Sequence, residues 1–412
     1  MNTRLFETLQ ERGYIYQMTD EEQVKKLLNG EPTVAYVGID PTADSLHIGH
    51  CLPLIMARHM QDAGHKIIVV LGGATAMIGD PSGKNEMRAM VSSDFVNKNR
   101  PGIEKAISHF LRLDGDNPAI VVNNADWYKG YEYIDFMRDI GVHFNVNKML
   151  SCDAYTTRLA NGGLTFFEMG YMLMQAYDFV YLNRQYGCRL EFGGSDQWAN
   201  IVAGADLGRK LALQEGKDAD TFQAFTNVLL LNADGKKMGK TEKGALWVDK
   251  DKCSPYDFYQ YFYNCDDRDV EKLLRILTYV PMDEIKTIMQ GDIRDAKKRM
   301  AYEITCLVHG VEEADKAVAT AQSLFGQGQS ANAPTKEISL ADLKDENLII
   351  DVLAAAGFVA SKGEARRLID QGGLYIEDDK ITSATQTITK EQLANGILFR
   401  RGKKQYLKIL AK

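Results

Sequence analysis

The stretch from Tyr36 to His50 constrains the fold most, because it joins two apolar segments through a loop and a helix. Residues 33–39 predict a short buried strand. Apolar residues then recur at helical spacing over 52–60, and residues 66–71 predict a second buried strand. Together they form a βαβ unit, whose loop lies at the carboxyl end of the first strand. We expect the free N–H groups at the helix start to receive an anion there.

The loop contains an unusual pair of histidines. A dinucleotide-binding fold would have G-x-G-x-x-G here, whereas this chain has His47 and His50 on either side of Ile48 and Gly49. Imidazoles can donate to phosphate oxygens beside the helix dipole, and Gly49 has no Cβ to keep a flat base off the backbone. This content predicts a nucleotide triphosphate site. Two histidines at a helix start can also be capping or core residues, so the pair alone leaves both interpretations open.

Length and composition indicate a globular chain of several domains. Its 412 residues predict two or three domains, and 45% hydrophobic with 25% charged residues is typical of a soluble protein. We expect no membrane span and no secretory signal, because no apolar run is long enough. Six cysteines without a C-x-x-C pair predict reduced thiols in a cytoplasm and no zinc site.

The net charge of -7 is unevenly distributed. Residues 358–412 hold 11 Lys and Arg against 6 Asp and Glu, which gives +5 and leaves -12 for the rest of the chain. A basic module on an acidic body indicates a polyanionic partner for that module. An ordinary surface of mixed charge is the other interpretation, and charge alone does not exclude it.

Further candidates follow the second strand. Asp80 lies in a turn-rich loop near the end of that strand, although an acid before a proline is more often a turn residue. Lys84 and Arg88 come next and could reach phosphates from outside the fold. Residues 95–160 alternate helical and strand-like patterns and predict an insertion, which is a plausible place for a subunit contact.

The segment from 164 to 187 predicts one long helix. Thr165 and Glu168 form a capping box, and Gly187 suits the helix end. Three polar side chains fall on one face of this helix: Tyr171, Gln175 and Asp178. An aspartate among apolar residues is costly to bury without a partner, so this face is either exposed to solvent or a binding wall.

Another strand and a glycine-rich loop complete the candidate set. Residues 188–192 predict a strand that opens into G-G-S-D-Q-W, where Gly194 permits close backbone approach and Asp196 could accept from a ribose hydroxyl. The loop over 232–247 is rich in lysine and could be a solvated turn. Its K-M-G-K-T run could instead swing over a triphosphate and neutralise it in the transition state.

Read together, these segments carry a family resemblance. H-I-G-H at 47–50 and K-M-G-K-T at 237–241 resemble the two signatures of class I aminoacyl-tRNA synthetases, in the same order and at a similar separation. With Y-M-L-M-Q-A-Y-D and G-G-S-D-Q-W, nearly the whole chain resembles the bacterial tyrosyl-tRNA synthetase family. The chain departs from the family at Gly239 and Thr241, where serines are usual, and at Ala199, where glycine is usual.

The resemblance implies the reaction. The tyrosine carboxylate would attack the α-phosphorus of ATP and give tyrosyl-adenylate and pyrophosphate, and the tyrosyl group would then pass to the 3′-terminal adenosine of tRNA(Tyr). Catalysis would need positioning and charge stabilisation, with no side-chain nucleophile. Mg²⁺ would arrive with ATP as substrate, and no protein-bound metal or organic cofactor is expected.

The resemblance also implies the site residues. The phosphates would be held by Thr42, His47, His50, Lys237, Lys240 and Thr241, with Lys84 and Arg88 as further candidates. The adenosine site would comprise Gly38, Asp40, Gly49, Gly194 and Asp196, with Lys240 at the ATP as well. The tyrosine pocket would comprise Tyr36, Asp80, Tyr171, Gln175, Asp178 and Gln197, in which Asp178 accepts from the phenol and Tyr36 donates to it.

The fold implied is α/β, with a Rossmann-like parallel sheet. We expect a catalytic domain over 1–222 with its insertion near 95–160, and a signature loop with a helical anticodon-side domain over 223–325. A linker over 326–345 and a small α+β RNA-binding domain over 346–412 follow. A helix over 358–370 and a closing hairpin would carry the phosphate contacts of the last domain: Arg366, Arg367, Arg400, Arg401, Lys403 and Lys404. The resemblance further implies a cytoplasmic homodimer.

Two other functions stay open on the residues alone. A nucleotidyltransferase with an H-x-G-H motif shares the adenylyl chemistry, but it predicts neither an amino acid pocket nor an RNA module. A non-catalytic RNA-binding protein could retain a dead nucleotide fold, although the intact histidines and lysines argue against decay. Tryptophanyl-tRNA synthetase is a near neighbour, and the Tyr171, Gln175 and Asp178 face favours tyrosine.

Overall fold

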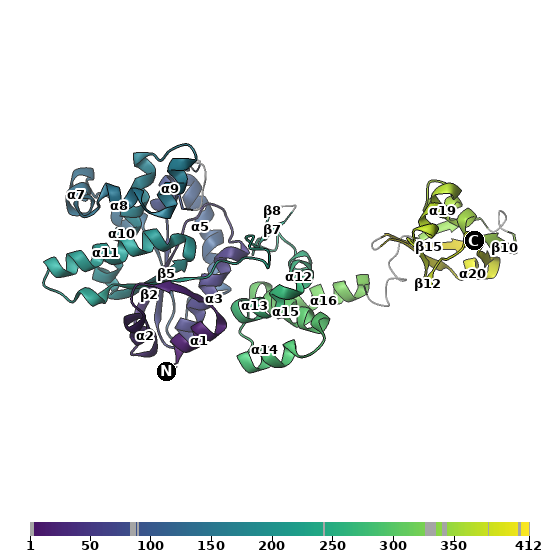
Figure 1. Ribbon diagram of the computed structural model, residues 1–412, viewed down its shortest axis with the longest axis horizontal. Helices are drawn as coiled ribbons and strands as arrows, with labels where there is room; N and C mark the ends of the chain where they lie inside the picture. The colour runs from purple at the N-terminus through teal and green to yellow at the C-terminus, as the bar shows by residue number, and fades with distance from the viewer. Residues whose placement is uncertain are drawn as a thin grey trace. The chain divides into compact units, whose positions relative to one another are not determined.

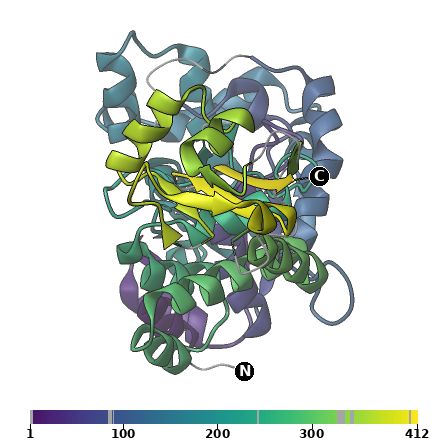
Figure 2. The same cartoon turned by 90° about the vertical axis from the view of Figure 1, so that its right-hand side faces the viewer.

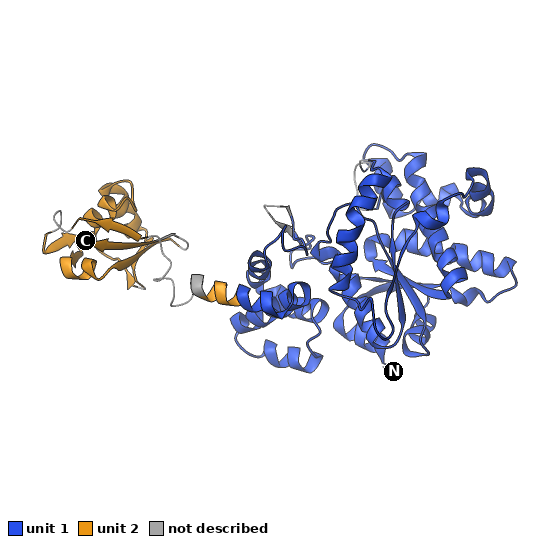
Figure 3. Cartoon of the chain, turned by 180° about the vertical axis from the view of Figure 1, so that it is seen from behind, with its two compact units in different colours: residues 1–317 blue, residues 318–412 orange. Residues whose placement is uncertain are grey.

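The computed structural model describes residues 4–82, 88, 90–241, 244–325, 335–339, 344–377, 379–402 and 405–411. The chain forms two compact units, residues 1–317 and 318–412, which are coloured separately in Figure 3. Each unit is described by itself. Among the described residues, no helix is both long and apolar enough to cross a membrane.

The first unit is built on a six-stranded sheet in the order β1-β6-β5-β2-β3-β4. Its strands are β1 (Ile15–Met18), β2 (Val34–Ile39), β3 (Lys66–Leu71), β4 (Ile120–Asn123), β5 (Cys188–Gly194) and β6 (Gln223–Asn227). The strands pair in parallel except β1, which is antiparallel to β6. The strand order reverses between β2 and β5, and ligands bind at such a switch point. The predicted Rossmann-like sheet is confirmed.

Helices cover both faces of this sheet, which explains why its central strands are apolar on both sides (Figure 1). One face carries α10 (Phe166–Tyr186) and α11 (Trp198–Gln214), and the other carries α3 (Ile48–Asp62). Two further helices, α1 (Leu5–Arg12) and α2 (Glu21–Asn29), precede β2. The Tyr36 side chain packs toward α10, with its ring centroid 5.4 Å from that of Phe179.

The long helix α10 begins and ends as its sequence predicts. The Thr165 hydroxyl accepts from the backbone N–H of Glu168, whose carboxylate accepts in return from the Thr165 N–H, and Gly187 ends the helix with φ 67°. The same carboxylate forms a buried ion pair with Arg158 at 2.9 Å. The start of α10 is therefore held against the preceding helix, α9 (Asp153–Ala160).

The first part of the segment expected as an insertion belongs to the main sheet. It contains α5 (Ser93–Ser108) and then β4, which pairs in parallel with β3. Short helices outside the sheet follow: α6 (Ala125–Tyr128), α7 (Tyr133–Asp139), η1 (Gly141–His143) and α8 (Val146–Leu150).

A helical segment follows the sheet, as its sequence pattern predicts. Its helices are α12 (Pro255–Tyr263), α13 (Val270–Leu277), α14 (Met282–Met289), α15 (Ile293–His309) and α16 (Val311–Phe325). The buried guanidinium of Arg12 donates to the carbonyls of Arg275, Thr278 and Val280 at 2.5 to 2.9 Å. These bonds join α1 to the end of α13.

The second unit is an α+β fold with its own apolar core. Its five-stranded sheet, drawn in yellow tones in Figure 2, has the order β12-β11-β14-β15-β9. The strands are β9 (Thr335–Ile338), β11 (Leu374–Ile376), β12 (Asp379–Lys380), β14 (Ile397–Arg401) and β15 (Gln405–Ala411). Strand β9 lies within the range expected as a linker and pairs in parallel with β15.

Helices of this unit are α18 (Ile349–Ala355), α19 (Lys362–Asp370) and α20 (Lys390–Ala394). The helix expected from Phe358 begins only at Lys362, because the Ser361 hydroxyl caps it by accepting from the Glu364 N–H at 3.2 Å. Strands β14 and β15 form the expected antiparallel hairpin.

Candidate active site

The two histidines at the start of α3 cap the helix and also face a cleft. Nδ1 of His47 accepts from the Gly49 N–H at 3.1 Å, and Nδ1 of His50 accepts from the His47 N–H at 3.4 Å. The rings stack with centroids 3.8 Å apart. The capping interpretation of the histidine pair is confirmed, and the same capping bonds fix the rings at the edge of the cleft, where a phosphate site stays a prediction.

The capping bonds set the chemistry of these rings. Desolvation, helped by neighbouring His47, lowers the pKa of His50 to about 3, so this ring is neutral at physiological pH. A neutral imidazole that accepts at Nδ1 carries its proton on Nε2. The Nε2 edge of His50 is thus a hydrogen-bond donor for an oxygen at the helix start.

Asp178, on α10, forms the acidic end of the cleft. Its carboxylate is 3% exposed and accepts from the Trp127 indole at 2.8 Å, the Tyr128 hydroxyl at 2.9 Å and the Asn124 amide at 3.1 Å. Burial raises its pKa to about 7 in spite of these three donors. The face of α10 is therefore a buried polar wall, and the solvent-exposed alternative is wrong.

A second buried carboxyl, which the sequence analysis missed, lies beside Tyr36. Glu191 on β5 is the register partner of Tyr36 on β2 and is 1% exposed. Its Oε1 accepts from the Gln175 amide at 3.0 Å. Burial raises its pKa to about 8. The signal in the sequence is an acidic residue between the apolar Leu190 and Phe192, in the middle of a predicted strand.

Two further carboxylates, Asp40 after β2 and Asp80 after β3, accept hydrogen bonds from α10 and from the segment after β5. The buried carboxylate of Asp80 accepts from the Gln197 amide at 2.7 Å and from Asn200 at 3.2 Å. The Tyr171 hydroxyl donates to Asp40 at 2.9 Å, and burial raises the pKa of Asp40 to about 6. These carboxylates make the neighbourhood suitable for a cationic group.

The lysine-rich loop crosses the start of α3. Nζ of Lys237 lies 3.1 Å from the Asp196 carboxylate, so two residues expected on ATP bind each other in this structure. The Gly239 N–H donates to the Tyr261 hydroxyl at 2.8 Å, and the Leu246 carbonyl accepts from the Ile48 N–H at 3.0 Å.

Gly239 explains one departure from the family pattern. Its φ is +88°, and a Cβ at this position would lie 2.5 Å from Cγ2 of Ile48. A serine would be strained there and would clash with the start of α3. The glycine thus permits the loop to lie directly against the histidine motif.

Most of the expected site residues line one cleft of about 500 Å³. They are Tyr36, Gly38, Asp40, Thr42, His47, Gly49, His50, Asp80, Arg88, Tyr171, Gln175, Asp178, Gly194, Asp196, Gln197 and Lys237. Arg88 is held by its Nε, which donates to the Asp80 carbonyl at 3.1 Å. Lys84 and the side chains of Lys240 and Thr241 lie outside the described residues. Within the described part, no group of three or more His, Cys, Asp and Glu could hold a metal ion.

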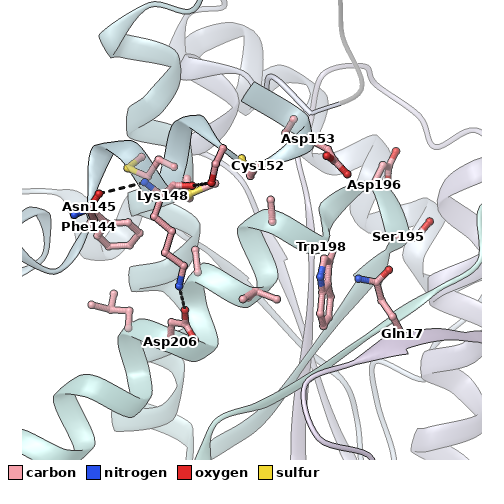
Figure 4. A pocket seen from close by; sticks show the side chains of 18 of the residues that line it. Gln17, Phe144, Asn145, Lys148, Cys152, Asp153, Ser195, Asp196, Trp198 and Asp206 are labelled. Carbon is pink, nitrogen blue, oxygen red and sulfur yellow. Dashed lines mark hydrogen bonds and ion pairs between the residues drawn. The ribbon is translucent and has the colours of Figure 1, made fainter. Parts of the chain in front are cut away.

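A second cavity, of about 820 Å³, lies beside this cleft between α8, α9 and α11 (Figure 4). Asp196 lines both cavities. Figure 4 shows Asp153, Trp198 and Ser195 around the second cavity, where Lys148 pairs with Asp206 at 2.8 Å.

The arginines of the second unit differ in their surroundings. Arg366 and Arg367 are exposed on α19. Arg400 stacks on the Tyr375 ring at 3.6 Å from its centroid, and Arg401 pairs with Glu364 at 2.8 Å. Lys403 and Lys404 lie outside the described residues.

Comparison with known proteins agrees with this arrangement. Residues 28–326 match the family of class I tRNA synthetases for tryptophan and tyrosine (W and Y), and residues 327–409 match the tyrosine–tRNA ligase SYY-like C-terminal domain. The tyrosine–tRNA ligase of Clostridium tetani is 51% identical over 100% of both chains, and that of Caldanaerobacter subterraneus subsp. tengcongensis is 50% identical over 99% of both. A C-terminally truncated mitochondrial tyrosyl-tRNA synthetase of Aspergillus nidulans is structurally similar, with a TM-score of 0.69 and 30% identity over 78% of this chain and 94% of that one.

The chain therefore belongs to the class I tRNA synthetases of the tryptophan and tyrosine family. This family uses ATP as a substrate and binds an amino acid and tRNA. The C-terminal match and the full-length relatives are those of the tyrosine enzymes, and tyrosine–tRNA ligation is the activity of this chain. The nucleotidyltransferase and non-catalytic alternatives are thereby wrong.

We expect the empty protein to lose stability as the pH rises from about 7.5 to about 8.5. Burial raises the pKa of Glu191 to about 8 in the folded chain, whereas an unfolded glutamate titrates near 4.3. The folded state then binds more protons than the unfolded state, so the free energy of unfolding falls by about 0.7 kcal/mol across this window from Glu191 alone. Urea unfolding of the empty protein at both pH values measures the change.

Glu191→Gln is the matched control, because the amide keeps the shape and does not titrate. We expect a smaller loss of stability for this variant over the same window. Histidines such as His50 and His59, whose pKa values are lowered, are neutral in the folded chain above pH 7 and change little there. An identical loss in both proteins would contradict the raised pKa of Glu191.

Proposed function

We propose that this chain activates L-tyrosine with ATP and transfers the tyrosyl group to the 3′-terminal adenosine of tRNA(Tyr), using the residues of the 500 Å³ cleft. The observation that carries the proposal is that one cleft joins three environments. A buried acid lies at one end, carboxylates suited to an ammonium lie in the middle, and two imidazoles at a helix start lie at the other end. A phenol, an amino group and a triphosphate fit these environments in that order.

Tyrosine recognition rests on the buried acid. The phenol of the substrate is both donor and acceptor, so it donates to Asp178 and accepts from the Tyr36 hydroxyl. Its ammonium lies among Asp80, Tyr171 and Gln175, and Gln197 lies along the substrate. Phenylalanine leaves the buried carboxylate without its substrate donor, which disfavours its binding.

The phosphates lie at the amino end of α3. His47 and His50 donate to them beside Thr42, and the backbone N–H groups of the helix start add a positive potential. ATP enters with Mg²⁺ bound to its own phosphates. The adenosine can approach Gly38 closely, because no heavy atom lies within 4 Å of its Cβ position, and Gly194 lines the same cleft.

The chemical step follows from positioning. An oxygen of the tyrosine carboxylate forms a bond to the α-phosphorus, the bond to the β-phosphate oxygen breaks, and pyrophosphate leaves. The ribose hydroxyl of tRNA then attacks the acyl carbon and releases AMP. Because carboxylate and phosphate repel each other, the histidines and the lysine-rich loop act by offsetting that charge.

The Lys237–Asp196 ion pair supports a role for loop movement. Asp196 is the expected partner of the ribose, and Lys237 is the expected partner of the phosphates. Lys237 and Asp196 cannot keep their 3.1 Å contact while Lys237 binds the phosphates and Asp196 binds the ribose. ATP binding thus replaces this pair, and the loop with Lys240 and Thr241 moves over the triphosphate.

The transfer step needs a path for the tRNA end. The 820 Å³ cavity borders the cleft at Asp196 and is open enough for nucleotides. Its lining includes Lys148 and Lys210 together with three carboxylates, those of Asp153, Asp196 and Asp206. The terminal adenosine reaches the adenylate through this cavity, and Arg366 and Arg367 of the second unit contact tRNA phosphates elsewhere.

A homodimer in the cytoplasm completes the proposal. Large apolar side chains are exposed in the segment outside the sheet and at the start of α10, among them Ile134 at 63%, Val142 at 71% and Phe166 at 69%. Such a surface fits a subunit contact. We expect sedimentation equilibrium to give twice the chain mass, and Phe166→Asp to weaken the association. A monomeric wild-type protein at micromolar concentration would contradict the dimer.

Pyrophosphate exchange across the twenty amino acids tests the function directly. We expect only tyrosine to support rapid exchange of labelled pyrophosphate into ATP. Asp178→Asn removes the charge that accepts the phenol proton, while its remaining Oδ1 can still accept from Trp127 and Tyr128. We expect this variant to raise the KM for tyrosine by about 30- to 100-fold, which corresponds to about 2 to 3 kcal/mol, with little change in the KM for ATP.

Asp196→Asn is the matched variant on the nucleotide side. We expect it to raise the KM for ATP and to leave the KM for tyrosine nearly unchanged. If the two variants affect the same KM, the separation of the cleft into an amino acid end and a nucleotide end is wrong. If another amino acid supports exchange better than tyrosine, the substrate assignment is wrong.

Binding of tRNA tests the role of the second unit. Replacing both Arg366 and Arg367 by alanine removes two exposed charges, so we expect weaker tRNA binding and a salt dependence whose slope is smaller by about 1 to 2. Pyrophosphate exchange, which needs no RNA, should be unchanged. Lys217→Ala, an exposed change in the first unit, is the control, and equal effects of both changes on tRNA affinity would argue against the assignment.

A further inference from the structure

Two buried oxygens in the tyrosine pocket face each other without an ordinary hydrogen bond. Neither the Tyr36 hydroxyl nor Oε2 of Glu191 makes a hydrogen bond of standard geometry with a described residue, although each lies close enough to shift the pKa of the other. Tyr36 and Glu191 are register partners on the adjacent parallel strands β2 and β5, so their side chains leave the sheet on the same face. A hydroxyl and a carboxyl oxygen that are buried together without a well-formed hydrogen bond are costly, which indicates a function for the pair.

The packing around Glu191 fixes its carboxyl group in this position. Oε1 accepts from the Gln175 amide at 3.0 Å. On the other side, a Cβ added at Gly204 of α11 would lie 2.8 Å from Oε2. The carboxyl is therefore confined between β2, α10 and α11, and the cleft lined by Tyr36 and Asp178 is its open side.

We propose that Glu191 is a positioning residue for tyrosine selection, whose protonated carboxyl donates to the Tyr36 hydroxyl and turns the Tyr36 proton toward the phenol oxygen of the substrate. This inference rests on the proposed tyrosine pocket. A phenol needs one acceptor and one donor. Asp178 is the acceptor, and Tyr36 becomes a reliable donor only when its own oxygen is already engaged by another donor.

The charges around Glu191 favour its neutral form. The titratable groups that face it are Tyr36 on β2 and Asp178 on α10, and Cys188 lies on its own strand. Helix α11 presents Gly204, which carries no charge. Burial, together with the negative charge of Asp178, raises the pKa of Glu191 to about 8, although the hydrogen bonds of Gln175 and Tyr36 act in the opposite direction. Ionised Glu191 would instead accept the Tyr36 proton and draw it away from the substrate.

The test is the ratio of kcat/KM for tyrosine to kcat/KM for phenylalanine in pyrophosphate exchange, measured from pH 7 to pH 9. The ratio cancels the titration of the amino group that both substrates share. For the wild type we expect the ratio to fall at least fivefold over this range. For Glu191→Gln, whose amide donates to Tyr36 at every pH, we expect the ratio to change less than twofold.

Two further variants keep the test decisive. Glu191→Met removes the donor at similar size, so we expect a low ratio at every pH. Tyr36→Phe removes the hydroxyl that Glu191 orients, so we expect a low ratio that no longer depends on pH, and no added effect of Glu191→Gln in the double variant. A wild-type ratio that is constant with pH, or a parallel fall in Glu191→Gln, would overturn the inference. Absence of tyrosine-dependent exchange in the wild type would instead overturn the proposed function.

Discussion

The parallel pairing of β2 with β5 is the contact on which the site depends. These strands come from the two halves of the sheet, and their carboxyl ends open the cleft between them. Val34 pairs with Cys188 but Ala35 pairs with Leu190, so Arg189 is an extra residue in β5. Without this irregularity Tyr36 would be opposite Leu190, and Glu191 would point to the other face. One bulge therefore decides which side chains line the cleft.

The second constraint is the backbone contact between the lysine-rich loop and α3. Ile48 donates to the Leu246 carbonyl, and Leu246 donates to the Gly239 carbonyl. These backbone bonds hold the two signature motifs next to each other, although about 190 residues separate them in the chain. The histidines are fixed by their capping bonds, whereas Lys237 is half exposed and reaches only Asp196. The proposed phosphate ligands thus combine fixed side chains and an exposed lysine at the same helix start.

Several parts of this molecule follow from local sequence, and others require the fold. The strands, the capped helix α10 and the histidine motif are encoded by spacing and capping residues that act within a few positions, so they could be predicted. Glu191 could not, because its role depends on the bulge and on pairing with β2. The donors to Asp178 were also missed, since Asn124, Trp127 and Tyr128 follow β4 in a segment that was expected to be an insertion. Helix α19 begins later than expected because Ser361 caps it.

The buried acids show how the pocket can match a phenol in both of its hydrogen-bonding roles. Asp178 has three donors and titrates near neutrality, whereas Glu191 has a single donor and keeps its proton to higher pH. Two adjacent carboxyls in the same low-dielectric space cannot easily be charged together, so their environments separate their protonation states. In the proposed pocket, Asp178 is then the acceptor for the phenol, and Glu191 is the acid that acts through Tyr36. In the proposed pocket, a ligand with a hydroxyl at this point pairs with both Asp178 and Tyr36, and a ligand without it pairs with neither. Selectivity for tyrosine thus follows from the cost of burying these acids, a cost that the empty protein bears in its stability.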